Sequence, residues 1–253
     1  EENNFSKASF VEPAPDRMTH PLVAAEDPEL SIMEADVGAS GLAAVWAREN
    51  TREAIWDAMA RKETYATSGT RMSVRVFAGW DFTEEEVHRP DFARTGYDRG
   101  VPMGGDLTNA PDGAAPVMMI RSLRDPDGAN LDRIQVVKGW LDADGNTQEK
   151  IYDVACGDRA IVDHACDGDV GNTVDVADAS YTNTVGDPLL VAHWVDPDFD
   201  AAQKAFYYVR VLEIPTPRWT AYDAKFFGVT PPEGTTMQLQ DRAYTSPIWY
   251  TPG

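Results

Sequence analysis

The chain has 253 residues, of which 43% are hydrophobic and 25% are charged. This length and composition indicate a folded protein with one large or two modest domains, and they exclude a minidomain and a wholly disordered chain. Lys and Arg number 22 against 42 Asp and Glu, and the resulting net charge of −20 repels phosphate backbones and anionic lipid surfaces, so nucleic acid is not expected as a partner.

The sequence pattern of residues 1–38 predicts an extended arm that wraps over the surface of the protein. Several prolines stand among many acidic residues there, and neither the helical nor the strand period is sustained. The chain starts at Glu1 with neither Met nor a leader, so we expect a processed or truncated product, or the ordered part of a longer one. The longest apolar run, residues 41–47, is far shorter than the ~20 residues that cross a bilayer, and no membrane span is predicted.

One helix is predicted after the arm, over residues 51–62. Asn50 can cap it, and Glu53 stands three residues later as a capping-box partner. The apolar residues that line one side of this helix at helical spacing are Ile55, Trp56 and Met59.

Beyond the helix the pattern changes to strands separated by turns. Residues 64–67 are β-branched and aromatic, and apolar residues alternate with polar ones at 72–76. The Asp-Gly turn at 144–145 predicts a hairpin. The further predicted strands are 117–123, 134–141, 150–154, 189–195 and 205–214. The expected fold class is therefore mixed α/β and mostly β, with an antiparallel sandwich-like domain.

Cys156 and Cys166 are the only cysteines, and they stand ten positions apart. We favour a disulfide between them, with two free thiols and a metal site as the alternatives, because His164 alone completes no standard zinc spacing. A disulfide would indicate an oxidising compartment, so we expect a periplasmic or secreted protein.

No self-contained catalytic motif is present. The four histidines stand in none of the spacings that place two imidazoles on one face of a helix or strand, and no nucleophile elbow occurs. Asp196, Asp198 and Asp200 are spaced as in a calcium loop, but Ala201 and Val209 occupy the positions that require Gly and Glu. We favour a hydrogen-bonded turn for this segment over a calcium site.

A proline-fixed loop follows the last long predicted strand and carries Arg218 and Trp219. A rigid loop of this kind could present a guanidinium and an indole to a ligand. Stacking of the same two side chains could instead close a domain interface, and we favour the interface.

The sequence strongly resembles a bacterial family called domain of unknown function 3604, over nearly all of its length. That family is similar to the carbaryl-hydrolase-like metallohydrolases, which are related to the polymerase and histidinol phosphatase superfamily. The strings that carry the resemblance occur in order, and they include GLAAVWARENTREAIWDAMARKETYATSG (41–69), RVFAGWDF (75–82), DPDGANLDRIQVVKGW (125–140), AFYYVRVLEIPTPRW (205–219) and SPIWYTP (246–252).

The resemblance implies a metal-dependent hydrolase of esters, carbamates or phosphoesters. Its fold would be a (β/α) barrel followed by a β-rich domain, with this chain as the C-terminal half. Residues 1–69 would supply the arm and the terminal helix and strand of the barrel, and residues 70–253 the β-rich domain. The divalent metal, Mn, Zn or Fe, would be bound by an upstream segment, so we assign this chain no metal ligands.

The same resemblance suggests which residues line the substrate pocket. Glu2 and Asn3 would lie near the mouth of the metal site, while Arg71, Arg218 and Trp219 would face the substrate side. Besides a small-molecule substrate, the expected partners are the N-terminal half of the same protein and further copies of the chain. The alternatives are a binding module without chemistry, gripping glycans or a partner through an aromatic face, and a secreted scaffold.

Overall fold

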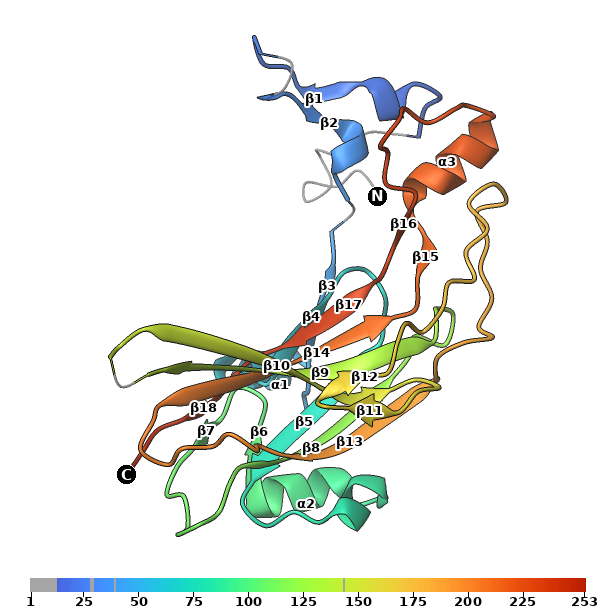
Figure 1. Ribbon diagram of the computed structural model, residues 1–253. Helices are drawn as coiled ribbons and strands as arrows, with labels where there is room; N and C mark the ends of the chain where they lie inside the picture. Colours follow the sequence, from blue (N-terminus) through green and yellow to red (C-terminus); the bar gives the residue numbers. More distant parts are fainter. Residues whose placement is uncertain (1–12, 28–29, 39, 143) are drawn as a thin grey trace.

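The computed structural model describes residues 13–27, 30–38, 40–142 and 144–253. They form a β-sandwich with a smaller lobe above it, to which the N-terminal segment and helix α3 belong (Figure 1). Glu2 and Asn3 lie outside the described residues. No helix in the described ranges is long and apolar enough to span a membrane.

A large sheet of eight strands forms one layer of the sandwich. Its pairs are antiparallel except that β18 runs parallel to β7. Six strands follow in the order β10 (Thr147–Cys156), β9 (Leu131–Leu141), β14 (Ala205–Glu213), β17 (Arg242–Thr245), β4 (Thr64–Thr67) and β3 (Leu42–Val45), while β18 (Ile248–Tyr250) pairs with β14 and β7 (Asp106–Leu107) pairs with β18.

A small sheet of four antiparallel strands forms the other layer, in the order β13 (Leu189–Val195), β8 (Val117–Leu123), β5 (Ser73–Gly79) and β6 (Gly100–Pro102). The β-rich, antiparallel fold expected from the sequence is thus observed. The described residues contain no closed barrel, because β4 lies between β17 and β3 as an ordinary antiparallel strand. The sequence division at residues 69 and 70 falls between β4 and β5, which belong to different sheets.

The core lies between the two sheets and follows from strand alternation. In β14, Tyr207, Val209 and Val211 are buried in it, whereas Phe206 and Tyr208 point to the outer face of the large sheet. On the outer face of the small sheet, a separate apolar cluster joins the sheet to α2 (Phe92–Arg99) and to the short helix η5 (Glu84–His88).

The upper lobe combines the N-terminal segment with a segment from the later part of the chain, around α3. Its other short elements are η2 (Arg17–Thr19), β1 (Pro21–Val23), β2 (Ile32–Met33), η4 (Glu34–Asp36), β15 (Thr216–Pro217) and β16 (Gln238–Leu239). The buried guanidinium of Arg17 forms an ion pair with Asp223 of α3 (Trp219–Phe227), with Nη2 and Oδ2 2.6 Å apart. The expected arm therefore packs on α3 with some regular structure of its own.

Helix α1 (Arg52–Ala60) occupies the place predicted for a helix but is shorter at both ends. Thr51, rather than the predicted Asn50, caps it, because the Thr51 hydroxyl accepts a hydrogen bond of 3.3 Å from the Ala54 amide. Two of the three residues of its predicted apolar side are exposed, Trp56 by 68% and Met59 by 54%, whereas Ile55 is half-buried.

Candidate functional site

Arg71, a predicted pocket residue, lies in a network of acidic side chains at the start of β5. Its Nε is 3.1 Å from Asp125 Oδ2, and its Nη2 is 2.6 Å from Asp127 Oδ2. The hydrogen bond to Asp125, followed by the one to Asp127, raises the pKa of Arg71. Two carboxylates thus already neutralise this guanidinium, which keeps part of its surface exposed.

Arg218 and Trp219 bind a different segment, the N-terminal part of the upper lobe. The two terminal nitrogens of Arg218 donate to the carbonyls of Ala35 and Val37, each at 2.7 Å, and Trp219 Nε1 donates to Val37 at 3.0 Å. Burial lowers the pKa of Arg218. The guanidinium of Arg17 stacks 4.2 Å from the Trp219 ring. These contacts are those of an interface between segments of the chain.

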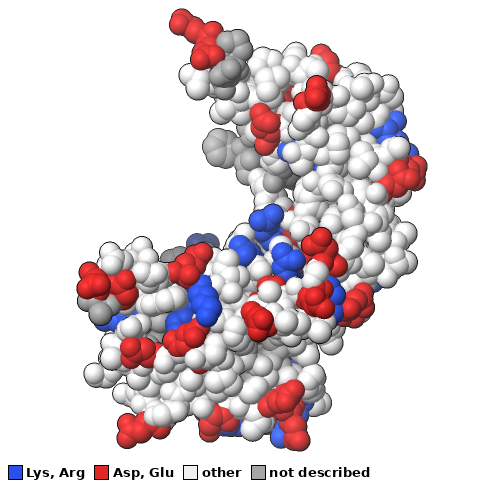
Figure 2. All heavy atoms as spheres, viewed as in Figure 1, with Lys and Arg blue, Asp and Glu red and all other residues white. Residues whose placement is uncertain are grey.

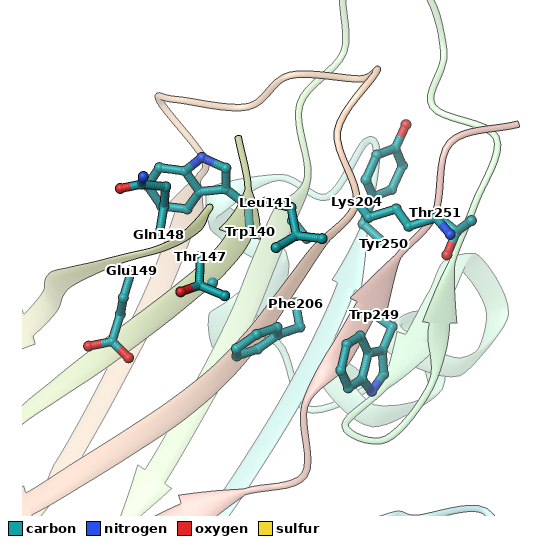
Figure 3. A pocket seen from close by; sticks show the side chains of 12 residues that line it. Trp140, Leu141, Thr147, Gln148, Glu149, Lys204, Phe206, Trp249, Tyr250 and Thr251 are labelled. Atoms are coloured by element: carbon teal, nitrogen blue, oxygen red, sulfur yellow. The ribbon is translucent and has the colours of Figure 1, made fainter. Parts of the chain in front are cut away.

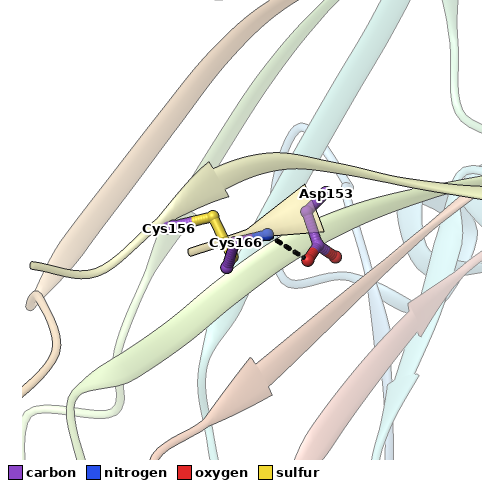
Figure 4. Close-up of side chains that lie close together, drawn as sticks. All are labelled: Asp153, Cys156 and Cys166. Carbon is purple, nitrogen blue, oxygen red and sulfur yellow. Dashed lines mark hydrogen bonds between the residues drawn. A yellow bond between two sulfur atoms is a disulfide. The ribbon is translucent and has the colours of Figure 1, made fainter. Parts of the chain in front are cut away.

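Cys156 and Cys166 form the predicted disulfide, which closes the short hairpin of β11 (Ile161–Val162) and β12 (Ala165–Cys166) onto the end of β10. Within the described ranges, one group of three or more His, Cys, Asp and Glu side chains lies close enough together to hold a metal. It consists of these two cysteines and Asp153 (Figure 4). Both sulfurs are bonded to each other, and Asp153 accepts a hydrogen bond of 2.8 Å from the Cys166 amide. This group does not fit a metal site.

The Asp196–Asp200 segment is the hydrogen-bonded turn that its sequence favours. Asp196 forms a buried ion pair with Lys138, with Nζ and Oδ2 2.7 Å apart, and accepts a hydrogen bond from the Tyr207 hydroxyl. The hydroxyl of Tyr152 donates to Asp198 at 2.6 Å. Cationic and hydroxyl groups of the sandwich thus occupy the carboxylates that a calcium ion would need.

A cleft of about 990 Å³ lies where α1, β5 and α2 meet, and we call it the Trp46 cleft. Its volume is within the usual range for small-molecule sites. Most of its wall comes from the 41–69 string that carries the family resemblance. The lining residues are Trp46, Ala47, Arg48, Glu49, Thr51, Glu53, Ala54, Asp57, Arg61, Glu63, Arg75, Tyr97 and Pro102.

Arg75 and Trp46 form the aromatic and cationic wall of the cleft. The Arg75 guanidinium lies 4.4 Å from the Trp46 ring, and Trp46 Nε1 donates to the Val74 carbonyl at 2.8 Å. The Arg75 Nε is buried and has no hydrogen-bond partner among the described residues. The fold therefore leaves this donor without a partner, in a side chain that lines the cleft.

Glu63 supplies a buried carboxylate to the same cleft. It accepts a hydrogen bond from the Tyr97 hydroxyl, and its Oε2 lies 3.4 Å from Arg61 Nη2. Burial and this bond to Glu63 raise the pKa of Tyr97, while a bond of 2.9 Å from Arg75 lowers it. Tyr97 therefore stays a neutral hydroxyl, which links the carboxylate to the guanidinium.

No sequence motif marks Trp46, Glu63, Arg75 or Tyr97 as a site residue. The first two lie in the 41–69 string and the third in the 75–82 string, so the resemblance did mark the segments that build the cleft. Nothing local in the sequence joins them to Tyr97, which α2 brings to β5 from further along the chain.

Acidic side chains are scattered over both lobes on the face shown in Figure 2, in keeping with the net charge of −20. Several Lys and Arg side chains gather beside the hollow between the upper lobe and the sandwich. Local positive charge thus exists on a strongly acidic molecule.

A family model described as "Protein of unknown function (DUF3604)" matches residues 1–252. The chain therefore belongs to this family. Comparisons with curated proteins and with solved structures found no match.

Proposed function

We propose that this DUF3604 protein works in a metal-dependent hydrolase that acts on an ester, a carbamate or a phosphoester. In this proposal the chain shapes the substrate pocket, and the metal ligands come from polypeptide outside residues 1–253. The one group of metal-ligand side chains in the described residues is a disulfide pair with Asp153 and does not suit a metal ion. No metal-dependent chemical step is therefore assigned to this chain's own residues.

The exposed apolar side of α1 carries the proposal. A helix of nine residues that exposes a Trp and a Met at helical spacing has a face built for packing. This helix belongs to the 41–69 string, whose strands β3 and β4 lie in the large sheet of the sandwich. Further polypeptide packed on Trp56 and Met59 would lie directly beside the Trp46 cleft, because Ala54 and Asp57 of the same helix line it.

The cleft residues would then bind and orient the substrate. Arg75 is a planar cation fixed against Trp46 at the wall of the cleft, and a guanidinium suits a carbonyl or phosphoryl oxygen. Glu63 and Tyr97 hold that guanidinium in place. The disulfide supports an oxidising location, and we extend this to a periplasmic or secreted enzyme.

Metal and activity measurements on the protein from its native source test the proposal. We expect stoichiometric Mn, Zn or Fe, together with hydrolysis of p-nitrophenyl acetate, p-nitrophenyl N-methylcarbamate or bis(p-nitrophenyl) phosphate. Arg75→Lys should raise KM more than it lowers kcat, because the fork of donors is lost while the charge stays. Absence of both metal and hydrolysis would overturn the proposal.

A surface variant separates the packing face from general stability. Replacing Trp56 and Met59 by Ser in the full protein should lower metal content and activity together, because the metal-bearing polypeptide would dock less tightly. Phe226→Ser is the matched control, since Phe226 is an 81% exposed apolar residue on α3. Equal losses of metal content and activity in both variants would show that the exposed side of α1 is not the packing face.

A further inference from the structure

A second concave surface lies on the outer face of the large sheet and shares no lining residue with the Trp46 cleft. It has a volume of about 480 Å³, and we call it the Trp249 groove. Its walls come from β9, β10, β14 and β18 (Figure 3). The labelled side chains are Trp140, Leu141, Thr147, Gln148, Glu149, Lys204, Phe206, Trp249, Tyr250 and Thr251.

The floor of the groove is an aromatic platform. Trp249 pairs with Phe206 across β18 and β14, their ring centroids are 5.2 Å apart, and Trp249 is 45% exposed. Gly139 on β9 makes room for the Phe206 ring, because a Cβ at that position would lie 2.3 Å from Phe206 Cζ. The aromatic row continues along β14 at Tyr208, which packs 6.3 Å from Tyr244. Rings that lie against a sheet and remain partly exposed present flat faces to a ligand.

Polar groups border this platform without being used by the fold. Glu149 and Lys204 are exposed, and neither side chain makes a hydrogen bond or ion pair with another described residue. The hydroxyls of Thr147 and Thr251 also line the groove. Apolar faces ringed by a few hydrogen-bonding groups are typical of sites for small organic ligands.

We propose that the Trp249 groove binds a neutral oligosaccharide. A pyranose ring has an apolar C–H face, which stacks on an aromatic ring, and a rim of hydroxyls, which exchange hydrogen bonds with a carboxylate, an amine and hydroxyls. The single negative and single positive charge of the groove cancel, and the net charge of −20 repels an anionic sugar. This binding requires no metal and no hydrolysis, so it stands or falls independently of the proposed enzymatic function.

Isothermal titration calorimetry with cellohexaose, maltohexaose and chitohexaose as separate probes tests the proposal. We expect at least one of them to bind saturably. Trp249→Ala should weaken that binding about tenfold, which corresponds to about 1.4 kcal/mol. Glu149→Gln should weaken it by a smaller factor, and this exposed residue can be changed without loss of the fold.

Phe226→Ala is the matched control, because it removes an exposed aromatic ring from α3 and should leave saccharide binding unchanged. The proposal is overturned if no probe binds saturably, or if Trp249→Ala binds as tightly as the original protein. It is also overturned if Trp249→Ala changes the oligomeric mass in size-exclusion chromatography while no sugar binds, since the groove would then be a contact between copies.

Discussion

Glu213 is a carboxyl that the fold buries completely. It ends β14 with no exposed surface, and neither oxygen has a hydrogen bond in the described structure. Burial, followed by the charge of Asp241, raises the pKa of Glu213 from 4.5 to about 8, while the nearby Thr70 hydroxyl and, less strongly, the charge of Arg124 oppose this. The protein thus holds a neutral carboxylic acid at pH 7.

Stability should therefore fall as the pH rises from 5 to 9. The folded-state pKa of Glu213 lies above the unfolded one, so its contribution is complete below pH 4.5 and is lost as the pH passes through about 8. Glu213→Gln removes this dependence. The gain in unfolding free energy of the variant over the original protein should therefore be larger at pH 9 than at pH 5. Urea unfolding at both pH values is the measurement, and an unchanged pH dependence in the variant would refute the assignment.

Lys138 and Asp196 form a buried pair whose two members depend on each other. Lys138→Met leaves the Asp196 charge in the core and should cost about 3 to 5 kcal/mol of unfolding free energy. Adding Asp196→Asn removes that charge and should restore part of the loss. Lys150→Met at the exposed pair with Asp198 should cost less than about 1 kcal/mol, and equal losses at both lysines would contradict this interpretation.

At the scale of elements, the strands could be predicted because their signal is local. The predicted strands 117–123 and 189–195 coincide with β8 and β13, since runs of apolar residues bounded by turns fix both ends. The sequence indicated where helix α1 lies but not its first residue. Asn50 and Thr51 are both favourable N-cap residues, and only the backbone geometry shows that Thr51 is the cap. The pairing of β4 with β17 joins distant segments and left no local signal.

The disulfide hairpin gives a prediction at the same scale. Replacing Cys156 and Cys166 by Ser should lower the unfolding free energy by about 2 to 3 kcal/mol, because the short closed loop no longer restricts the unfolded chain. Dithiothreitol should lower the stability of the original protein by a similar amount and leave the double variant unaffected. Chemical denaturation with and without reductant makes the comparison, and a variant as stable as the original would contradict it.

At the scale of the whole molecule, the candidate sites arise where distant segments meet. The Trp46 cleft needs α1, β5 and α2 together, and the Trp249 groove needs four strands of the large sheet. The sequence could indicate an aromatic face in general terms but not its place. It also offered Arg218 and Trp219 as pocket residues or as an interface, and only tertiary structure shows them holding the upper lobe.

The exposed Trp56 and Met59 of α1 are the observation on which the proposed hydrolase function rests. In the proposed function this side of the helix is a packing face, and the polypeptide that covers it would carry the metal. The disulfide and the acidic surface describe the surroundings in which this assembly would work, and neither supplies the reactive group.

Native mass spectrometry of the protein extracted from its source tests this claim most directly. We expect an intact mass well above the 27.8 kDa of these residues, with a divalent metal retained in the heavier species and lost when Trp56 and Met59 are replaced by Ser. A species of 27.8 kDa that holds one metal ion per chain, or a heavier one whose metal survives those replacements, would contradict it.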